Sequence, residues 1–335
     1  MIELQPFKAL VVRQDEEKKV THALETVTLN DLAPGEVIIK VAYSSVNFKD
    51  SLAVKAGAGV VRNYPMIPGI DLSGTVVASD DARFKEGQNV LVTGFKVGMS
   101  HTGGFSEYAR IPADWVVPLP DGLSLRDAMV IGTAGFTAAL SIMALESKGM
   151  KVENQPSILV VGASGGVGST AVQLLAASGY KNICGLTRKK EEETQLLQNL
   201  GASAVIGADE VIPEKPALLG KTKFDFVLDT VGGPLAVALV PQISYGGSMT
   251  MCGNAGGVAF ETNVLPFILR GISVLGIDSV ERPMDDRPQI WSRFAAEWSI
   301  MAKSIVDETN LEGLSAVFEA LQSGTHVGRT IVKIG

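Results

Sequence analysis

The chain has 335 residues, 46% of them hydrophobic, and a formal net charge of −7. This length exceeds the usual size of a single domain and predicts two. The negative charge argues against a nucleic-acid or anionic-membrane partner. The start Met1-Ile-Glu-Leu-Gln lacks the features of a signal peptide, and no run approaches the roughly 18 apolar residues of a membrane span. Cys184 and Cys252 lie in apolar runs, as free thiols do in a reducing compartment, so we expect a cytoplasmic protein.

Short β-rich runs separated by turn signals extend from Leu4 to about Pro120 and predict a compact, partly open barrel. The clearest runs are Val37–Ala42, Gly74–Ala78, Val90–Thr93 and Tyr108–Ile111. A helical stretch follows at Leu125–Leu145.

Strands and helices then alternate, and six strands in this order predict a doubly wound parallel sheet, which makes the chain an α/β protein. The strands are expected at Ile158–Gly162, Asn182–Leu186, Ala204–Ile206, Phe224–Asp229, Ser248–Cys252 and Ile272–Ile277. Two more helices are expected at Gln289–Ile305 and Leu314–Leu321, and a last strand at Arg329–Ile334 is expected to return to the first domain.

The first of these strands runs into the glycine-rich segment Gly162–Gly168, and a helix at Ser169–Ser178 follows directly. Glycines permit the tight turn and a close backbone approach, while the free N–H groups of the helix suit a pyrophosphate. Ordinary strand-to-helix turns also use such loops, so the segment is a weak signal when taken alone. The residues expected to contact a dinucleotide here are Ser164, Gly165, Gly166, Val167 and Gly168.

A second signal comes about 20 residues later, where an NAD-specific fold places Asp or Glu on the ribose hydroxyls. This chain instead has Thr187, Arg188 and Lys189, a hydroxyl and two cations that suit a 2′-phosphate. The pattern favours NADPH. The alternative is a solvated start to the helix at Glu191–Leu200.

The domain order and several segments resemble the acrylyl-CoA reductase subfamily (YhdH/YhfP-type quinone oxidoreductases) of the medium-chain dehydrogenase/reductase superfamily. The segments are Asn47–Asp50, Arg62–Asp71, Gly132–Thr137, Leu265–Gly271 and Leu275–Ser279. The resemblance implies a GroES-like catalytic domain at 1–126 and 283–335, with an NADPH-binding Rossmann domain at 127–282. It also implies reduction of a double bond conjugated to a carbonyl or thioester, and a homodimer formed at the edge of the Rossmann sheet.

Many superfamily members hold a catalytic and a structural zinc with Cys and His. Two cysteines together with His22, His101 and His326 cannot build both sites, and none has ligand spacing. We therefore expect a zinc-independent enzyme. Backbone N–H groups, side-chain donors or the cofactor must then polarise the carbonyl.

Asn47 and Asp50 are the polar residues expected nearest the nicotinamide. Asn47 is a candidate donor to cofactor or substrate or a strand-end cap, and Asp50 orients Asn47 or Lys49 or serves as a helix N-terminal carboxylate. Relatives often have tyrosine where this chain has Phe48, so a proton would have to come from Tyr64, Tyr43, Lys49 or water. Packing is the alternative role of either tyrosine.

On the cofactor side, Thr137 is expected to cap a helix. The resemblance places six further residues near the nicotinamide half of the cofactor, and it implies that Arg329 contacts the cofactor. The six are Cys252, Gly253, Asn254, Ile277, Asp278 and Ser279. Asp229 and Asp278 are equally strand-end loop residues, and Arg329 is otherwise an exposed turn charge. The cations considered for CoA phosphates are Arg62, Lys96, Arg270 and Arg282, each otherwise a solvated charge.

The favoured function is thus NADPH-dependent reduction of a small enoyl thioester such as acryloyl-CoA. A quinone or enone reductase on the same scaffold is the closest alternative, since hydride delivery to a quinone tolerates Phe48. A non-catalytic NADPH-binding protein is a third.

Overall fold

The computed structural model describes residues 5–215, 217–298, 300 and 303–335, so the first barrel residue predicted, Leu4, lies outside them. The chain forms two compact units. The first comprises 1–133, 280–297 and 306–335, and the second comprises 134–279 and 298–305. The predicted boundaries at 126 and 282 lie within seven residues of these unit boundaries. Residues 298–305, however, belong to the second unit, whereas the prediction placed them in the first domain.

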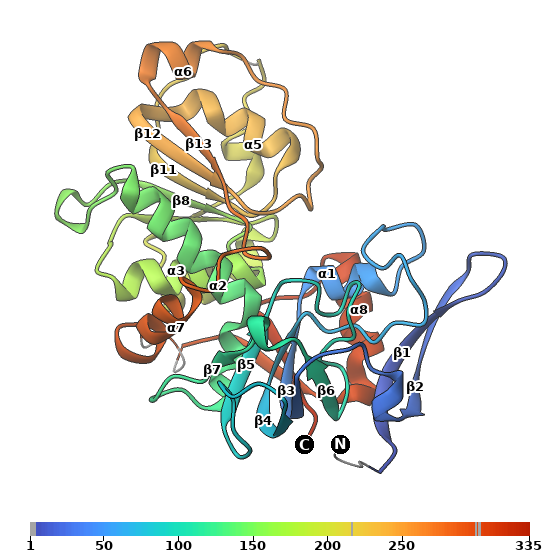
Figure 1. Ribbon diagram of the computed structural model, residues 1–335. Coiled ribbons are helices and arrows are strands. Elements are labelled where there is room, and N and C mark those ends of the chain that lie inside the picture. The colour runs from blue at the N-terminus through green and yellow to red at the C-terminus, as the bar shows by residue number, and fades with distance from the viewer. Residues whose placement is uncertain (1–4, 216, 299, 301–302) are drawn as a thin grey trace. The chain divides into compact units, whose positions relative to one another are not determined.

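The first unit is built on a seven-stranded sheet in the order β14-β15-β3-β4-β5-β7, with β6 pairing β3 (Figure 1). Its strands are β3 (Val37–Val46), β4 (Asp71–Ser79), β5 (Asn89–Thr93), β6 (Tyr108–Ile111), β7 (Val117–Pro118), β14 (Val306–Thr309) and β15 (Arg329–Lys333). Alternating residues of β3, β4 and β5 fill its core. The final strand, β15, pairs β3, so the chain returns to the first domain as predicted.

A separate hairpin of β1 (Phe7–Gln14) and β2 (Val20–Val27) completes the β-structure of this unit. Its helices include α1 (Phe48–Ala53), α7 (Arg287–Ala296) and α8 (Leu314–Ser323), with α1 lying against α8 (Figure 1). The prediction of one helix over Gln289–Ile305 was wrong. Helix α7 ends at Ala296 because the chain leaves the first unit after Glu297, and residues 299, 301 and 302 of the predicted helix lie outside the described part.

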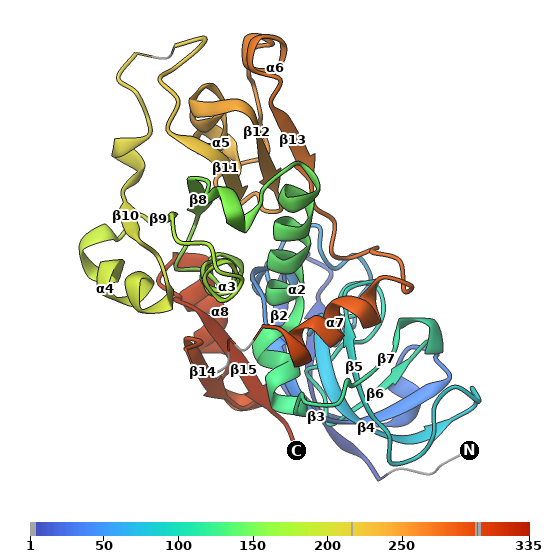
Figure 2. The same ribbon diagram turned by 90° about the vertical axis from the view of Figure 1, so that its left-hand side faces the viewer.

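The second unit contains the predicted six-stranded parallel sheet, in the order β10-β9-β8-β11-β12-β13. Its strands are β8 (Ile158–Val161), β9 (Ile183–Leu186), β10 (Ala204–Ile206), β11 (Phe224–Asp229), β12 (Ile243–Met251) and β13 (Ser273–Gly276). Strand order reverses between β8 and β11, so the crevice at their carboxyl ends is where such sheets bind ligands. The helices α3 (Gly166–Ala177), α4 (Lys190–Leu200), α5 (Gly233–Leu239) and α6 (Leu265–Arg270) accompany the strands (Figure 2).

Helix α2 (Leu125–Ser147) is broken at Gly132, whose φ of 50° and ψ of −160° are not helical. By length and composition it is apolar enough to cross a membrane, so the expectation that no run approaches a span was wrong. Because 83% of its most apolar window is buried inside the protein, it has the character of a core helix.

Candidate functional site

The glycine loop between β8 and α3 has the geometry of a phosphate cradle. Gly162 has a φ of 69°, and a Cβ on Gly168 would lie 2.1 Å from the Gly162 carbonyl oxygen, so neither position accepts a side chain. Residues 164–167 remain partly exposed. Helix α3 begins at Gly166, earlier than the predicted Ser169, so its unpaired first-turn N–H groups belong to this loop. The loop therefore fits a dinucleotide pyrophosphate.

The cationic segment lies where β9 ends and α4 begins. Arg188 is exposed and Lys189 half-buried, whereas the Lys190 ammonium is 2.7 Å from Glu210. Thr187 is buried, and its hydroxyl donates to the carboxylate of Glu193. The segment thus offers two cations to an anion, but the Thr187 proton is already used within the protein.

Two loops at the carboxyl ends of β11 and β12 pack backbone to backbone. A Cβ on Gly253 would lie 1.9 Å from the Thr230 carbonyl oxygen, which requires glycine there. The Cys252 thiol donates to the Asp229 carbonyl, and burial raises the pKa of Cys252 to about 12. The Asp229 carboxylate accepts from the N–H groups of Val231 and Gly232, which makes Asp229 a loop-closing residue. Asn254 follows on the exposed part of the loop.

Thr137 and Ser279 are brought together across 142 positions of sequence, with a hydroxyl-to-hydroxyl hydrogen bond of 2.8 Å. Thr137 lies inside α2, so the prediction that it caps a helix was wrong. The Ile277 N–H donates to the Met251 carbonyl, and the next residue, Asp278, is exposed.

A buried polar network in the first unit is centred on Asp71, which is fully buried at the start of β4. One carboxylate oxygen accepts from the Ser45 hydroxyl at 2.6 Å, the Asn47 amide at 2.8 Å and the Thr133 N–H at 2.8 Å. The other accepts from the Thr133 hydroxyl at 2.5 Å. The close approach of Thr133 to Asp71 requires glycine at position 132, because a Cβ there would lie 2.6–2.7 Å from atoms of Arg329, Asp71 and Ser45.

Arg329 faces this carboxylate at 4.0 Å and is only 4% exposed, so the alternative of an exposed turn charge was wrong. Its five N–H groups all have protein acceptors. These are the carbonyls of Val46, Met129 and Val130, the Ser45 hydroxyl and the Asn47 side-chain oxygen. Burial lowers the pKa of Arg329, and the nearby Asp71 and Asp50 oppose that shift.

Asn47 joins the two charges and is held in one orientation. Its Nδ2 donates to Asp71, and its Oδ1 accepts from Arg329 at 3.2 Å. A flipped amide would place oxygen against carboxylate and NH₂ against guanidinium. Asn47 also directly precedes α1, as expected for a capping residue. Its side-chain amide, however, bonds to Asp71 and Arg329.

Asp50 is buried beneath Asn47. Its oxygens accept from the N–H groups of Asn47 at 2.8 Å and Ile70 at 3.0 Å. Burial, together with the charge of Asp71, raises the pKa of Asp50 to about 7. Asp50 therefore holds the start of α1 and does not reach an open surface.

The remaining sequence candidates are placed as follows. The Tyr64 hydroxyl donates to the Val61 carbonyl at 3.4 Å, and its ring packs on a small apolar cluster. Phe48 is 41% exposed at the start of α1. Of the cations considered for CoA, Arg270 donates to backbone carbonyls and Arg282 pairs with Asp286, while Arg62 and Lys96 are exposed.

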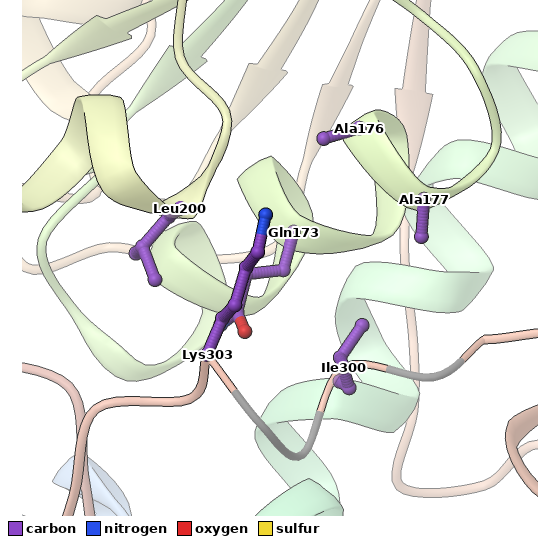
Figure 3. Close-up of a pocket in the computed structure, with 6 residues that line it drawn as sticks. All are labelled: Gln173, Ala176, Ala177, Leu200, Ile300 and Lys303. Atoms are coloured by element: carbon purple, nitrogen blue, oxygen red, sulfur yellow. The ribbon is translucent and has the colours of Figure 1, made fainter.

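A hollow of about 190 Å³ in the second unit does not include the glycine loop (Figure 3). It is lined by Gln173, Ala176, Ala177, Leu200, Ile300 and Lys303. Gln173 lies about 10 Å along α3 from its glycine start, at 1.5 Å per residue. The Gln173 side chain is also engaged, because the Ser304 hydroxyl donates to it.

Comparisons with known proteins agree with this geometry. Residues 33–121 match the alcohol dehydrogenase GroES-like domain, and residues 166–297 match the zinc-binding dehydrogenase domain. The acrylyl-CoA reductase AcuI of Ruegeria pomeroyi is 41% identical over 98% of this chain and 99% of its own length. The chain belongs to the medium-chain dehydrogenase/reductase superfamily. It is an oxidoreductase of the AcuI/YhfP subfamily, as its motifs predict.

Two solved structures of this subfamily cover 98% of this chain and all of their own. YhdH from Salmonella enterica, crystallised in complex with NADP, is 41% identical with a TM-score of 0.92. YhfP from Bacillus subtilis, with NAD bound, is 44% identical with a TM-score of 0.94.

Zinc, which the second domain's description implies, does not fit the donors present. Within residues 5–215, 217–298, 300 and 303–335, no three His, Cys, Asp or Glu side chains form a group able to hold a metal. Asn47, Thr133 and Asp71 form a hydrogen-bonded network instead.

Ser45, Asp71, Thr133 and Glu193 belong to the networks described above, and sequence reasoning missed all four. Asp71 and Thr133 stand in motifs that carried the family resemblance, and this was the only signal in the sequence.

Stability should fall with pH because of Asp50. Its pKa in the folded protein lies above the ordinary value of 3.8, so from about pH 4 to 7 the folded state keeps a proton that the unfolded chain has lost. We expect the free energy of unfolding to decrease by about 2–3 kcal/mol between pH 5 and pH 8 relative to Asp50→Asn, measured by denaturant titration. Parallel profiles for the two proteins would contradict this assignment.

Proposed function

We propose that this protein is an NADPH-dependent reductase of the conjugated double bond of a small α,β-unsaturated thioester such as acryloyl-CoA. The observation that carries the cofactor is the glycine loop Gly162–Gly168 opening into α3, followed by the cations Arg188 and Lys189 beyond β9. The substrate class rests on the full-length similarity to AcuI.

The backbone of residues 164–168 would hold the pyrophosphate, and Arg188 and Lys189 the 2′-phosphate. The residues proposed near the nicotinamide half are Thr137, Cys252, Gly253, Asn254, Ile277 and Ser279. Bound NADPH supplies a hydride for the β-carbon of the substrate. The chain must then orient the acceptor, stabilise negative charge on its carbonyl oxygen and allow a proton to reach the α-carbon.

Asn47 is the residue proposed to contact cofactor or substrate. One Nδ2 hydrogen is used by Asp71, and the side chain is half-buried, so the second hydrogen is available to an acceptor. Arg329 and Asp71 act through Asn47 by fixing which end of its amide points outward. This preorganisation is what a developing oxyanion needs, because the donor need not reorient during the reaction.

The proton is best supplied by solvent. Phe48 has no hydroxyl, Asp50 is buried on two backbone N–H groups, and Tyr64 would have to leave the Val61 carbonyl. The absence of a hydroxyl at Phe48 favours a second candidate function, because hydride transfer to a quinone needs less acid catalysis than reduction of an enoyl thioester. YhfP, assigned as a quinone oxidoreductase, is 44% identical to this chain.

Substrate assays decide between these two functions. Oxidation of NADPH, followed by its absorbance, should be rapid with acryloyl-CoA and slower with crotonyl-CoA and a simple quinone. Turnover confined to the quinone would support the cofactor assignment but contradict the proposed substrate, and it would favour a quinone reductase. Absence of turnover with every electrophile, despite NADPH binding, would favour a non-catalytic binding protein.

We also propose a homodimer through the open edge of the second unit's sheet. Strand β13 ends the sheet, and exposed apolar side chains lie on β12, α6 and the loop that precedes it. They are Tyr245, Val258, Val264, Ile268 and Leu269. A second copy pairing along β13 would satisfy the open edge and cover apolar side chains beside it.

Light scattering of the purified protein should give the mass of a dimer, because the exposed apolar side chains and the open edge favour self-association. Ile268→Lys, at an exposed position of α6, should shift the protein toward monomer. Ile212→Lys should not, because Ile212 is exposed in the same unit but lies after β10. A monomer mass for the unmodified chain would contradict this proposal.

A further inference from the structure

The segment after β9 contains two opposed charges. Arg188 and Lys189 present positive charge outward, whereas Glu193 lies behind the segment and is only 6% exposed. The Glu193 N–H also bonds the Lys189 carbonyl at 2.9 Å, so the first turn of α4 fixes this carboxylate to the segment. A negative charge held here opposes a 2′-phosphate dianion, and burial reduces its screening by salt.

The hydrogen bonds of Thr187 have a defined direction. Its hydroxyl proton goes to Glu193, and its oxygen accepts from the Lys189 N–H at 3.2 Å. A hydroxyl whose proton is committed can accept one more bond but cannot donate to a phosphate. Thr187 stands about 20 residues beyond the glycines, where NAD-type folds hold the ribose 2′-hydroxyl with a carboxylate. In this chain the carboxylate is that of Glu193, which does not stand at that position but hydrogen-bonds to Thr187, the residue that does.

We propose that the protein uses both NADPH and NADH, and that Glu193 is a specificity-determining residue acting through Thr187. Arg188 and Lys189 favour the 2′-phosphate of NADPH. The Thr187–Glu193 pair favours the 2′-hydroxyl of NADH, which donates to the Thr187 oxygen, and disfavours the dianion. This inference rests on the proposed reductase function and deepens its cofactor assignment.

The test compares dissociation constants for NADPH and NADH, measured by nicotinamide fluorescence, in the unmodified protein and two matched variants. Glu193→Gln keeps an oxygen to accept the Thr187 hydroxyl but removes the charge. Glu192→Gln removes the same charge from an exposed neighbour in the same helical turn. Thermal unfolding of each variant checks that it folds.

We expect the unmodified protein to bind both cofactors, with NADPH the tighter. Glu193→Gln should raise the preference for NADPH by about 3–10-fold, and Glu192→Gln by less than about 2-fold. NADPH binding without detectable NADH binding at millimolar concentration would overturn the inference and leave the reductase proposal standing. So would an unchanged preference in Glu193→Gln, or equal changes in both variants. Failure to bind either cofactor would overturn the proposed function itself.

Discussion

The burial of two opposite charges, Asp71 and Arg329, is the constraint on which the first unit depends. Removing both from water is costly unless each charge is paired and hydrogen-bonded, and losing one partner of such a pair costs about 3–5 kcal/mol. The chain meets this requirement with Ser45 and Asn47 around both groups, and with Thr133 on the carboxylate. Helix α2 is broken at Gly132 so that an N–H group can face Asp71. The same bonds that stabilise the charges leave the Asn47 amide with a single orientation.

Each unit contains a buried charge that is held behind a polar side chain. In the first unit a carboxylate and a guanidinium fix a neutral amide, which suits contact with a developing oxyanion. In the second unit a glycine backbone leaves room for a pyrophosphate, and a buried carboxylate behind Thr187 is set against two outward cations. Both arrangements place a charge one hydrogen bond behind the group that would contact the ligand.

The strands and the glycine loop of the second unit could be predicted from the sequence, whereas the buried polar network of the first unit could not. The signals in the second unit are local, because the loop Gly162–Gly168 and the cations at 188–189 each follow a strand within a few residues. The network of Asp71, Thr133 and Arg329 joins residues that lie up to 258 positions apart in the sequence. No rule based on the spacing of residues identifies such partners. The same reason explains why the sequence predicts Thr187 as a partner of the 2′-phosphate. The composition of the segment shows a hydroxyl, but only the fold shows that Glu193 takes its proton.

The most direct measurement is a double-mutant cycle on Asn47 and Asp71, read as kcat with NADPH and acryloyl-CoA alongside the Kd of NADPH. If Asp71 acts through Asn47, Asp71→Asn should lower kcat at least about tenfold with little change in Kd. The double variant with Asn47→Ala should then lose no more activity than Asn47→Ala alone. Asp114→Asn, at an exposed carboxylate, should leave kcat unchanged. Fully additive losses, or an unaltered kcat in Asp71→Asn, would contradict the claim that the buried pair positions Asn47.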